Sequence, residues 1–269
     1  MKIRFLSLGS GSSGNCYFLG TDSYGILIDA GIGSRKIKKI LAEYGITWDM
    51  IFGVFVTHDH NDHIKAVSWL GEKQHIPVYA TRETVNGINR CHYSSYKLET
   101  CARFIEKDTT VTVRDMSVTP IEVSHDANDN VGYFITIGDA SFSFFTDLGY
   151  IGKKVGECIK NTDYLIIEAN YDDMMLETGN YPPLLKSRIK SETGHLSNAE
   201  TANFLAENFA SSRLKHIWLC HLSKENNYPQ LAYRTVELAL SNKGITVGKH
   251  VQLTALERTA PTGMFEMEV

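Results

Sequence analysis

Three histidines and two aspartates gather within six residues of the sequence, directly after an apolar run that is typical of a buried strand. The run FGVFVT at residues 52–57 leads into His58, His60, Asp62 and His63. Imidazole and carboxylate groups have no packing reason to gather, but they are the ligands that Zn²⁺ and related divalent ions take. At an extended strand end His58 and His60 share a face, while Asp62 and His63 lie on the turn into a helix. The spacing therefore predicts a metal site.

Three further polar residues stand at the ends of other apolar runs. His125 closes VTPIEVSH, Asp147 closes FSFFTD and His221 closes HIWLCH. Because strand ends can meet at one edge of a sheet, we expect these residues to complete a site that one motif cannot form alone. Together with the histidine motif they supply enough ligands for two metal ions.

The elements that must position these residues include strands and helices in alternation. We expect strands near residues 3–8, 15–20, 25–29, 51–56, 111–113, 117–124, 131–137, 141–147, 164–170 and 216–221. We expect helices near residues 33–44, 62–72, 81–90, 151–160, 182–191, 198–208 and 228–242. No repeat or Pro/Gly linker marks a boundary, so the pattern predicts an α/β fold in one domain over residues 1–269, with two sheets faced by helices.

The N-terminal segment LGSGSSGNCYF has glycines in the spacing of nucleotide-binding motifs. Gly9, Gly11 and Gly14 match a dinucleotide-binding turn, and the first and last of them also match the opening of a P-loop. Both motifs need a helix after the glycines, because phosphates bind its N-terminal amides. The following residues predict a strand instead, and Asn15 and Cys16 replace the Lys and Ser/Thr of a P-loop. We therefore expect no nucleotide cofactor.

Composition and charge limit the remaining function classes. No apolar run approaches the ~20 residues of a membrane span, and the N-terminus reaches glycine too early for a signal peptide, so we expect a cytoplasmic protein without a membrane partner. Five scattered cysteines without a C-x-x-C pair predict neither a disulfide framework nor a thiolate zinc site. The net charge of −4 gives no overall basic surface, although cations cluster on expected helices at residues 34–40 and 184–190.

The order of the motifs along the chain resembles the metallo-β-lactamase superfamily. The resembling parts are LIDAG with Asp29, then H-x-H-x-D-H, a lone histidine, an aspartate and a last histidine. The resemblance implies an αββα sandwich of two mixed β-sheets flanked by helices, and it implies that Asp29 supports the ligand loop from behind. The implied ligands are His58, His60 and His125 for one metal, Asp62, His63 and His221 for the other, and Asp147 as the bridge between them.

The superfamily hydrolyses lactams, thioesters, lactones and phosphodiesters, and some of its members perform redox chemistry. Redox members carry an acidic residue at the position of His60, so the ligand set of this chain favours hydrolysis. Secreted lactamases that carry a cysteine at the position of Asp147 also match poorly. The metal motifs alone leave the substrate open.

Two later segments resemble motifs of the ribonuclease Z group. They are DYLIIEANYD, with Glu168, and ETGHLSNAETANFLAENF, with His195. The likeness implies that Glu168 orients His195 and that His195 faces the phosphate or the leaving oxygen. Independently, His195 precedes a helix that Ser197 or Asn198 caps, so its imidazole lies near the positive end of that helix, where an anion is favoured.

The glycine-rich loop, SHDANDNVGY, TDLGY, EANYD and GHLSN together resemble the YycJ/WalJ branch of the superfamily, which is associated with 5′-to-3′ exonuclease activity on double-stranded DNA. In that branch the loop would be a tight hairpin beside the site that lets a phosphodiester backbone approach. Ser12, Ser13 and Asn15 could then donate hydrogen bonds to the phosphate oxygens. Tyr171 stands where the branch carries a histidine, so the chain departs from the pattern there.

We therefore expect a DNA exonuclease that uses two divalent ions, Zn²⁺ or Mn²⁺ with Fe as a further option, and a metal-activated water. Asp62 would be the base for the attacking water, and His195 would stabilise the transition state or protonate the leaving oxygen. The expected partner is nucleic acid, DNA before RNA. Three alternatives stay open: an RNA-processing enzyme like ribonuclease Z, a small-molecule acyl hydrolase such as a thioesterase or lactonase, and a metal-bound scaffold without activity.

Overall fold

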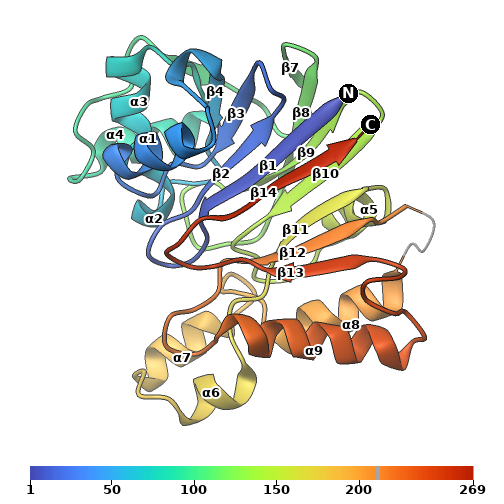
Figure 1. Cartoon of the computed structure of the whole chain (residues 1–269). Coiled ribbons are helices and arrows are strands. Elements are labelled where there is room, and N and C mark those ends of the chain that lie inside the picture. The colour runs from blue at the N-terminus through green and yellow to red at the C-terminus, as the bar shows by residue number, and fades with distance from the viewer. Residues whose placement is uncertain (210–212, 269) are drawn as a thin grey trace.

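Strands from both ends of the chain lie side by side in the first of two β-sheets (Figure 1). In the computed structural model, which describes residues 1–209 and 213–268, its seven strands follow the order β14 (Thr262–Glu268), β1 (Lys2–Gly9), β2 (Cys16–Gly20), β3 (Gly25–Ile28), β4 (Ile51–Phe55), β5 (Val78–Ala80) and β6 (Ala102–Phe104). Neighbours from β14 to β3 pair antiparallel, and neighbours from β3 to β6 pair parallel. The sheet is therefore mixed.

The second sheet is mixed in the same way. Within the same described ranges its seven strands follow the order β13 (Gln252–Ala255), β12 (His216–Cys220), β11 (Tyr164–Glu168), β10 (Ala140–Phe145), β9 (Val131–Ile137), β8 (Met116–Glu122) and β7 (Val111–Val113). Neighbours from β13 to β10 pair parallel, and neighbours from β10 to β7 pair antiparallel.

Aromatic side chains fill the space between the two sheets. Phe5 and Tyr17 come from the first sheet, and Phe144 and Trp218 come from the second. The ring of Phe5 lies 4.7 Å from that of Trp218 and 5.8 Å from that of Phe144. All four side chains are buried. Their burial and their ring contacts, edge-to-face between Phe5 and Phe144, hold the two sheets together.

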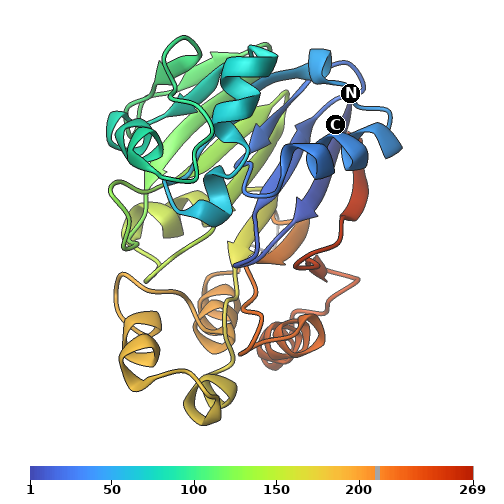
Figure 2. The same ribbon diagram turned by 90° about the vertical axis from the view of Figure 1, so that its left-hand side faces the viewer.

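Helices cover the outer faces of both sheets (Figures 1 and 2). The first sheet is covered by α1 (Ser34–Glu43), α3 (Val67–Gln74) and α4 (Arg82–Arg90), and the second by α5 (Lys153–Lys160), α8 (Asn198–Asn208) and α9 (Pro229–Asn242). The apolar faces of these helices, such as Ile37 of α1 and Val236 of α9, join the strands in two further core clusters. The layers are therefore αββα, which confirms the predicted fold class.

Shorter helices lie among the loops: α2 (Asn61–Ile64), α6 (Asp173–Thr178), α7 (Pro183–Ile189) and a 3₁₀ turn at Trp48–Met50. The helix expected over residues 62–72 is thus two helices, α2 and α3. Strands β5, β6, β13 and β14 were not expected from the sequence. None of the described helices combines the length and hydropathy needed to cross a bilayer.

Candidate metal centre

The carboxyl ends of six strands carry the polar residues of the site. Asp29 follows β3, His58 follows β4, His125 follows β8, Asp147 follows β10, Glu168 ends β11 and His221 follows β12. Three of them have positive φ angles: 57° at Asp29, 54° at Asp147 and 53° at His221. Left-handed backbone is uncommon for residues other than glycine and persists only where surrounding contacts hold it, most often at functional sites.

Three histidines form the first group of ligands. Nitrogen atoms of His58, His60 and His125 all lie within 4.8 Å of one another. Burial, and then the neighbouring His63, keep the pKa of His58 well below its ordinary value, so its imidazole is neutral, as a metal ligand must be. Among the described residues His58 Nε2 is buried without a hydrogen-bond partner. An unpaired buried nitrogen is costly unless a ligand satisfies it, so the group fits a cation.

Asp62, His63 and His221 form the second group. Their ligand atoms also lie within 4.8 Å of one another. Asp62 Oδ2 is 3.3 Å from His221 Nε2 and 3.6 Å from His63 Nε2. Both histidines are buried, while the Asp62 side chain is 24% exposed. One carboxylate and two imidazoles form a donor set that suits a second divalent ion.

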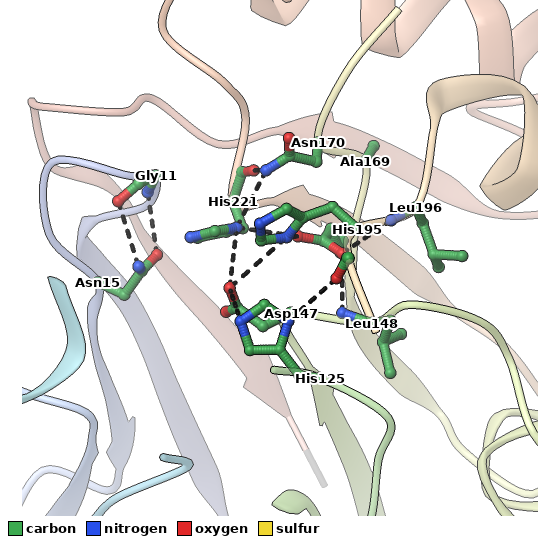
Figure 3. Close-up of polar contacts among 12 residues, drawn as sticks. Gly11, Asn15, His125, Asp147, Leu148, Ala169, Asn170, His195, Leu196 and His221 are labelled. Atoms are coloured by element: carbon green, nitrogen blue, oxygen red, sulfur yellow. Dashed lines mark hydrogen bonds and ion pairs between the residues drawn. The ribbon is translucent and has the colours of Figure 1, made fainter. Parts of the chain in front are cut away.

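Asp147 contacts a histidine of each group, and Figure 3 shows it beside His125 and His221. Its Oδ2 is 3.2 Å from His63 Nε2, and its Oδ1 is 3.6 Å from His125 Nε2. Its side chain is only 3% exposed. One carboxylate therefore reaches a histidine of each group, which is the position that a bridging ligand needs.

Contacts behind the ligands fix the orientation of their rings. His63 Nδ1 is 2.7 Å from Asp29 Oδ2, and the Asp29 carboxylate also accepts hydrogen bonds from the backbone N–H and hydroxyl of Thr57. His125 Nδ1 lies 3.0 Å from the carbonyl oxygen of Gly194. An imidazole that donates from Nδ1 presents Nε2 as the acceptor. The structure thus places Asp29 behind the ligand loop, whereas the sequence did not indicate the contact with Gly194.

Glu168 links two histidines of the centre. Its Oε1 is 2.8 Å from His195 Nδ1 and 2.9 Å from His221 Nδ1. Its Oε2 accepts hydrogen bonds from the backbone N–H groups of Leu148 and Leu196 at 2.8 and 3.0 Å. Burial by itself raises the pKa of Glu168, but His195 and His221 lower it to about 2, so the group is a carboxylate. The sequence predicted the contact with His195 and missed the one with His221.

His195 lies beside both groups of ligands. Its ring centroid is 5.0 Å from that of His125 and 5.3 Å from that of His221, and its side chain is 20% exposed. Burial lowers the pKa of His195, but the charge of Glu168 and its hydrogen bond give a net rise. Of the two caps considered, Ser197 is the N-cap of α8 and forms a reciprocal capping box with Glu200.

The glycine-rich loop contacts the ligand loop through Asn15. The side chain of Asn15 is fully buried, and its Nδ2 lies 3.0 Å from His63 Nε2 and 3.4 Å from the backbone oxygen of Asp62. Ser12 and Ser13 are exposed, and Ser12 lines the cavity over the centre. Strand β2 follows the loop, as predicted. The loop therefore lacks the helix N-terminus that a nucleotide-binding motif uses.

Gly31 is a site residue that the sequence reasoning missed. A Cβ atom on Gly31 would lie 1.6 Å from the backbone oxygen of Asp62. The neighbouring Ala30 N–H donates to the carbonyl of His63 at 2.8 Å, so the ligand loop packs directly on this backbone. The position of Gly31 two residues after Asp29 in LIDAG was the available signal.

Tyr171, the departure from the resembled branch, has a backbone contact with the start of α8. Its side chain is 3% exposed, and its carbonyl accepts a hydrogen bond from the N–H of Asn198 at 2.7 Å. The neighbouring Asn170 donates from Nδ2 to the carbonyl of His221 at 2.8 Å. Asn170 therefore contacts the centre directly.

A cavity of about 260 Å³ opens onto both groups of ligands. Its wall includes His60, Asp62, His125, Asp147, His195 and His221 of the centre, together with Ser12, Tyr181, Leu185 and Arg188. A polar substrate in this cavity would lie next to both candidate metal positions. The arrangement suits hydrolysis of an ester by an activated water.

Comparisons with known proteins agree with this geometry. The family described as "Beta-lactamase superfamily domain" matches residues 24–214. The exodeoxyribonuclease YycJ of Bacillus anthracis is 33% identical over 263 residues, which cover 97% of this chain and 98% of that relative. The exodeoxyribonuclease WalJ of Streptococcus pneumoniae is 35% identical over 261 residues, which cover 96% of this chain and 97% of that relative. The fold also matches the crystal structure of the metallo-β-lactamase fold protein YhfI from Bacillus subtilis, with a TM-score of 0.73 and 16% identity over 99% of this chain and all of that one.

The chain therefore belongs to the β-lactamase superfamily, which confirms the resemblance of its motifs. Its clusters of histidine and aspartate, in a metallo-β-lactamase fold, imply the use of divalent metal ions.

Proposed function

We propose that this chain is a nuclease that hydrolyses phosphodiester bonds of DNA and removes nucleotides from the 5′ ends of duplexes. The observation that carries the proposal is the pair of ligand groups joined by Asp147. Support for DNA as the substrate comes from the relatives named exodeoxyribonucleases, which align with almost the whole chain.

Seven side chains would hold two divalent ions, one ion in each group, with Asp147 in contact with both. They are His58, His60 and His125 for one ion, Asp62, His63 and His221 for the other, and Asp147 between them. Nitrogen-rich ligation favours Zn²⁺, while Mn²⁺ and Fe also bind such sets. When bound, the ions supply an activated water and neutralise charge on the phosphate.

Asp62 and His195 would move the protons of the reaction. Asp62 Oδ2 contacts His221, while Oδ1 has no hydrogen-bond partner among the described residues and could accept a proton from the attacking water. His195 Nδ1 is held by Glu168, which leaves Nε2 for the leaving oxygen or for the charge on the phosphate. Asp29 and Glu168 would position His63, His195 and His221 without touching the substrate.

The test is a comparison of substrates. The protein loaded with Mn²⁺ or Zn²⁺ is incubated with duplex DNA, single-stranded DNA and structured RNA, each labelled at one end. We expect degradation of duplex DNA with stepwise loss from its 5′ ends. Asp147→Asn, purified in the same way, controls for contaminating nucleases. A preference for RNA, internal cleavage, or equal activity of wild type and Asp147→Asn would contradict the proposal.

A further inference from the structure

Helix α7 lies beyond the strand ends, away from the outer faces of the two sheets (Figures 1 and 2). None of its residues from Pro183 to Ile189 is buried. The segment from Tyr181 to Ile189 nevertheless lines the cavity over the metal centre: Tyr181 precedes the helix, and Leu185, Arg188 and Ile189 belong to it. On the other side Leu184 is 85% exposed. The segment therefore presents one aromatic, two aliphatic and one cationic side chain to the cavity without a core role for any of them.

Arg188 lies close to the first group of ligands. Its Nε forms an ion pair with Asp126, and the Asp126 carboxylate lies 3.6 Å from His125 Nε2 and 4.0 Å from His60 Nε2. The Arg188 side chain is 57% exposed. Among residues 1–209 and 213–268 its two terminal nitrogens have no hydrogen-bond partner. Asp126 thus orients the guanidinium while leaving donors that match the geometry of a phosphate.

We propose that the segment of residues 181–189, which includes α7, binds the nucleic-acid strand next to the bond that is cleaved. Arg188 contacts the neighbouring phosphate, and Tyr181 packs against the base beside it, with Leu185 completing the apolar surface. A base stacks on an aromatic ring whatever its sequence, so this surface suits an enzyme that degrades DNA without sequence preference. The inference rests on the proposed nuclease activity and adds the residues that recognise the strand.

The local contacts of α7 make these residues good targets for substitution. The helix is held by its backbone, because the N–H of His195 donates to the carbonyl of Ile189 at 2.9 Å. Lys186, two residues before Arg188, donates instead to the carbonyl of Glu177 at 2.6 Å and does not line the cavity over the metal centre. Lys186→Ala therefore removes one positive charge from the same helix without touching the proposed surface.

The experiment compares Arg188→Ala, Arg188→Lys, Tyr181→Leu and Lys186→Ala with wild type. For each protein we would measure metal content, KM for duplex DNA at several salt concentrations, and turnover of bis(p-nitrophenyl) phosphate, a small diester that offers Arg188 no neighbouring phosphate and Tyr181 no base. We expect Arg188→Ala and Tyr181→Leu each to raise KM for DNA about tenfold. Arg188→Ala should also lower the slope of log affinity against log salt by about one, and Arg188→Lys should restore part of the affinity. Lys186→Ala should match wild type in all of these measurements. In every variant the metal content and the turnover of the small diester should also stay close to wild type.

The outcomes separate this inference from the function on which it rests. A wild-type protein that cleaves the small diester but neither binds nor degrades DNA overturns the proposed function and the inference with it. A wild type that degrades DNA, together with an Arg188→Ala variant of unchanged KM and salt slope, overturns the inference alone. Loss of metal from Arg188→Ala also overturns it, because Arg188 would then act on the ligands through Asp126.

Discussion

Replacement of Glu168 by glutamine should weaken metal binding as well as turnover. In the wild type one oxygen of Glu168 accepts hydrogen bonds from His195 and His221, and the other accepts two from the backbone of Leu148 and Leu196. Glutamine has a single carbonyl oxygen. The backbone N–H groups of Leu148 and Leu196 occupy it, because a backbone N–H can only donate a hydrogen bond. Its NH₂ group then faces both Nδ1 atoms, so each imidazole must carry its proton on Nε2. His221 with a protonated Nε2 cannot bind a metal ion there.

The size of the effect follows from the environment of Glu168. Burial raises the pKa of Glu168, but His195 and His221 lower it from 4.5 to about 2, so the two imidazoles contact a charged carboxylate. Loss of a residue that orients a metal ligand lowers metal affinity by about 10- to 100-fold, or roughly 1.4 to 2.8 kcal/mol. We therefore expect about a 100-fold loss of affinity for the ion that His221 binds. We expect a further loss of turnover of about 10², because His195 no longer has a carboxylate to stabilise its protonated form.

Competition with a chromogenic chelator would give the affinity of each metal site, and DNA hydrolysis at saturating metal would give the turnover. Glu192→Gln is the matched control, because Glu192 is exposed and only its backbone carbonyl contacts the region of the site, through Ser124. If Glu168→Gln bound both ions as tightly as wild type and kept its turnover, the role of Glu168 behind two histidines would be refuted.

Three further predictions concern catalysis, the ligand loop and pH. His195→Ala should keep its metal content and lose about 10²- to 10⁴-fold in turnover of DNA, and full activity in this variant would contradict the proposed role. Gly31→Ala should lose the ion bound by Asp62 and His63, since its Cβ would lie 1.6 Å from the Asp62 oxygen; a full metal complement by mass spectrometry would argue against this packing. Burial lowers the pKa of His216 from 6.5 to about 4, so below pH 6.5 the unfolded chain takes up a proton that the folded chain does not, and stability falls toward pH 4. Between about pH 7 and about pH 5 the free energy of unfolding in urea should fall less in His216→Gln than in wild type. An equal fall in the two proteins would contradict the link between protonation of His216 and stability.

The site was predictable where its residues follow apolar runs. The histidine motif after β4 and the single residues after β8, β10 and β12 could be predicted from the sequence, because each follows a strand and strand ends meet at one edge of the sheets. The relation between Glu168 and His195 came from a resemblance and is reproduced by a contact of 2.8 Å. The predictions of one domain over residues 1–269 and of a cytoplasmic location stay predictions.

The features that escaped the sequence depend on contacts between distant segments. Strand β14 pairs with β1 at the opposite end of the chain, as in the partners Lys2 and Glu268, and no local pattern indicates such a pairing. Strand β5 has three residues and offers too short a run to show a period. Asn15 was expected to face substrate, but its side chain contacts His63 instead. The sequence could not show this contact, because it forms only when β1 and β4 lie in one sheet. Arg188 lines a cavity whose walls come from distant segments of the chain, so its position beside the centre could not be read from the sequence.

The most direct test of the account is anomalous X-ray diffraction from crystals of the metal-loaded protein. We expect two peaks about 3.5 to 4 Å apart. One should lie among His58, His60 and His125, the other among Asp62, His63 and His221, with Asp147 in contact with both. A single peak, or peaks outside these two groups, would contradict a centre that binds two metal ions.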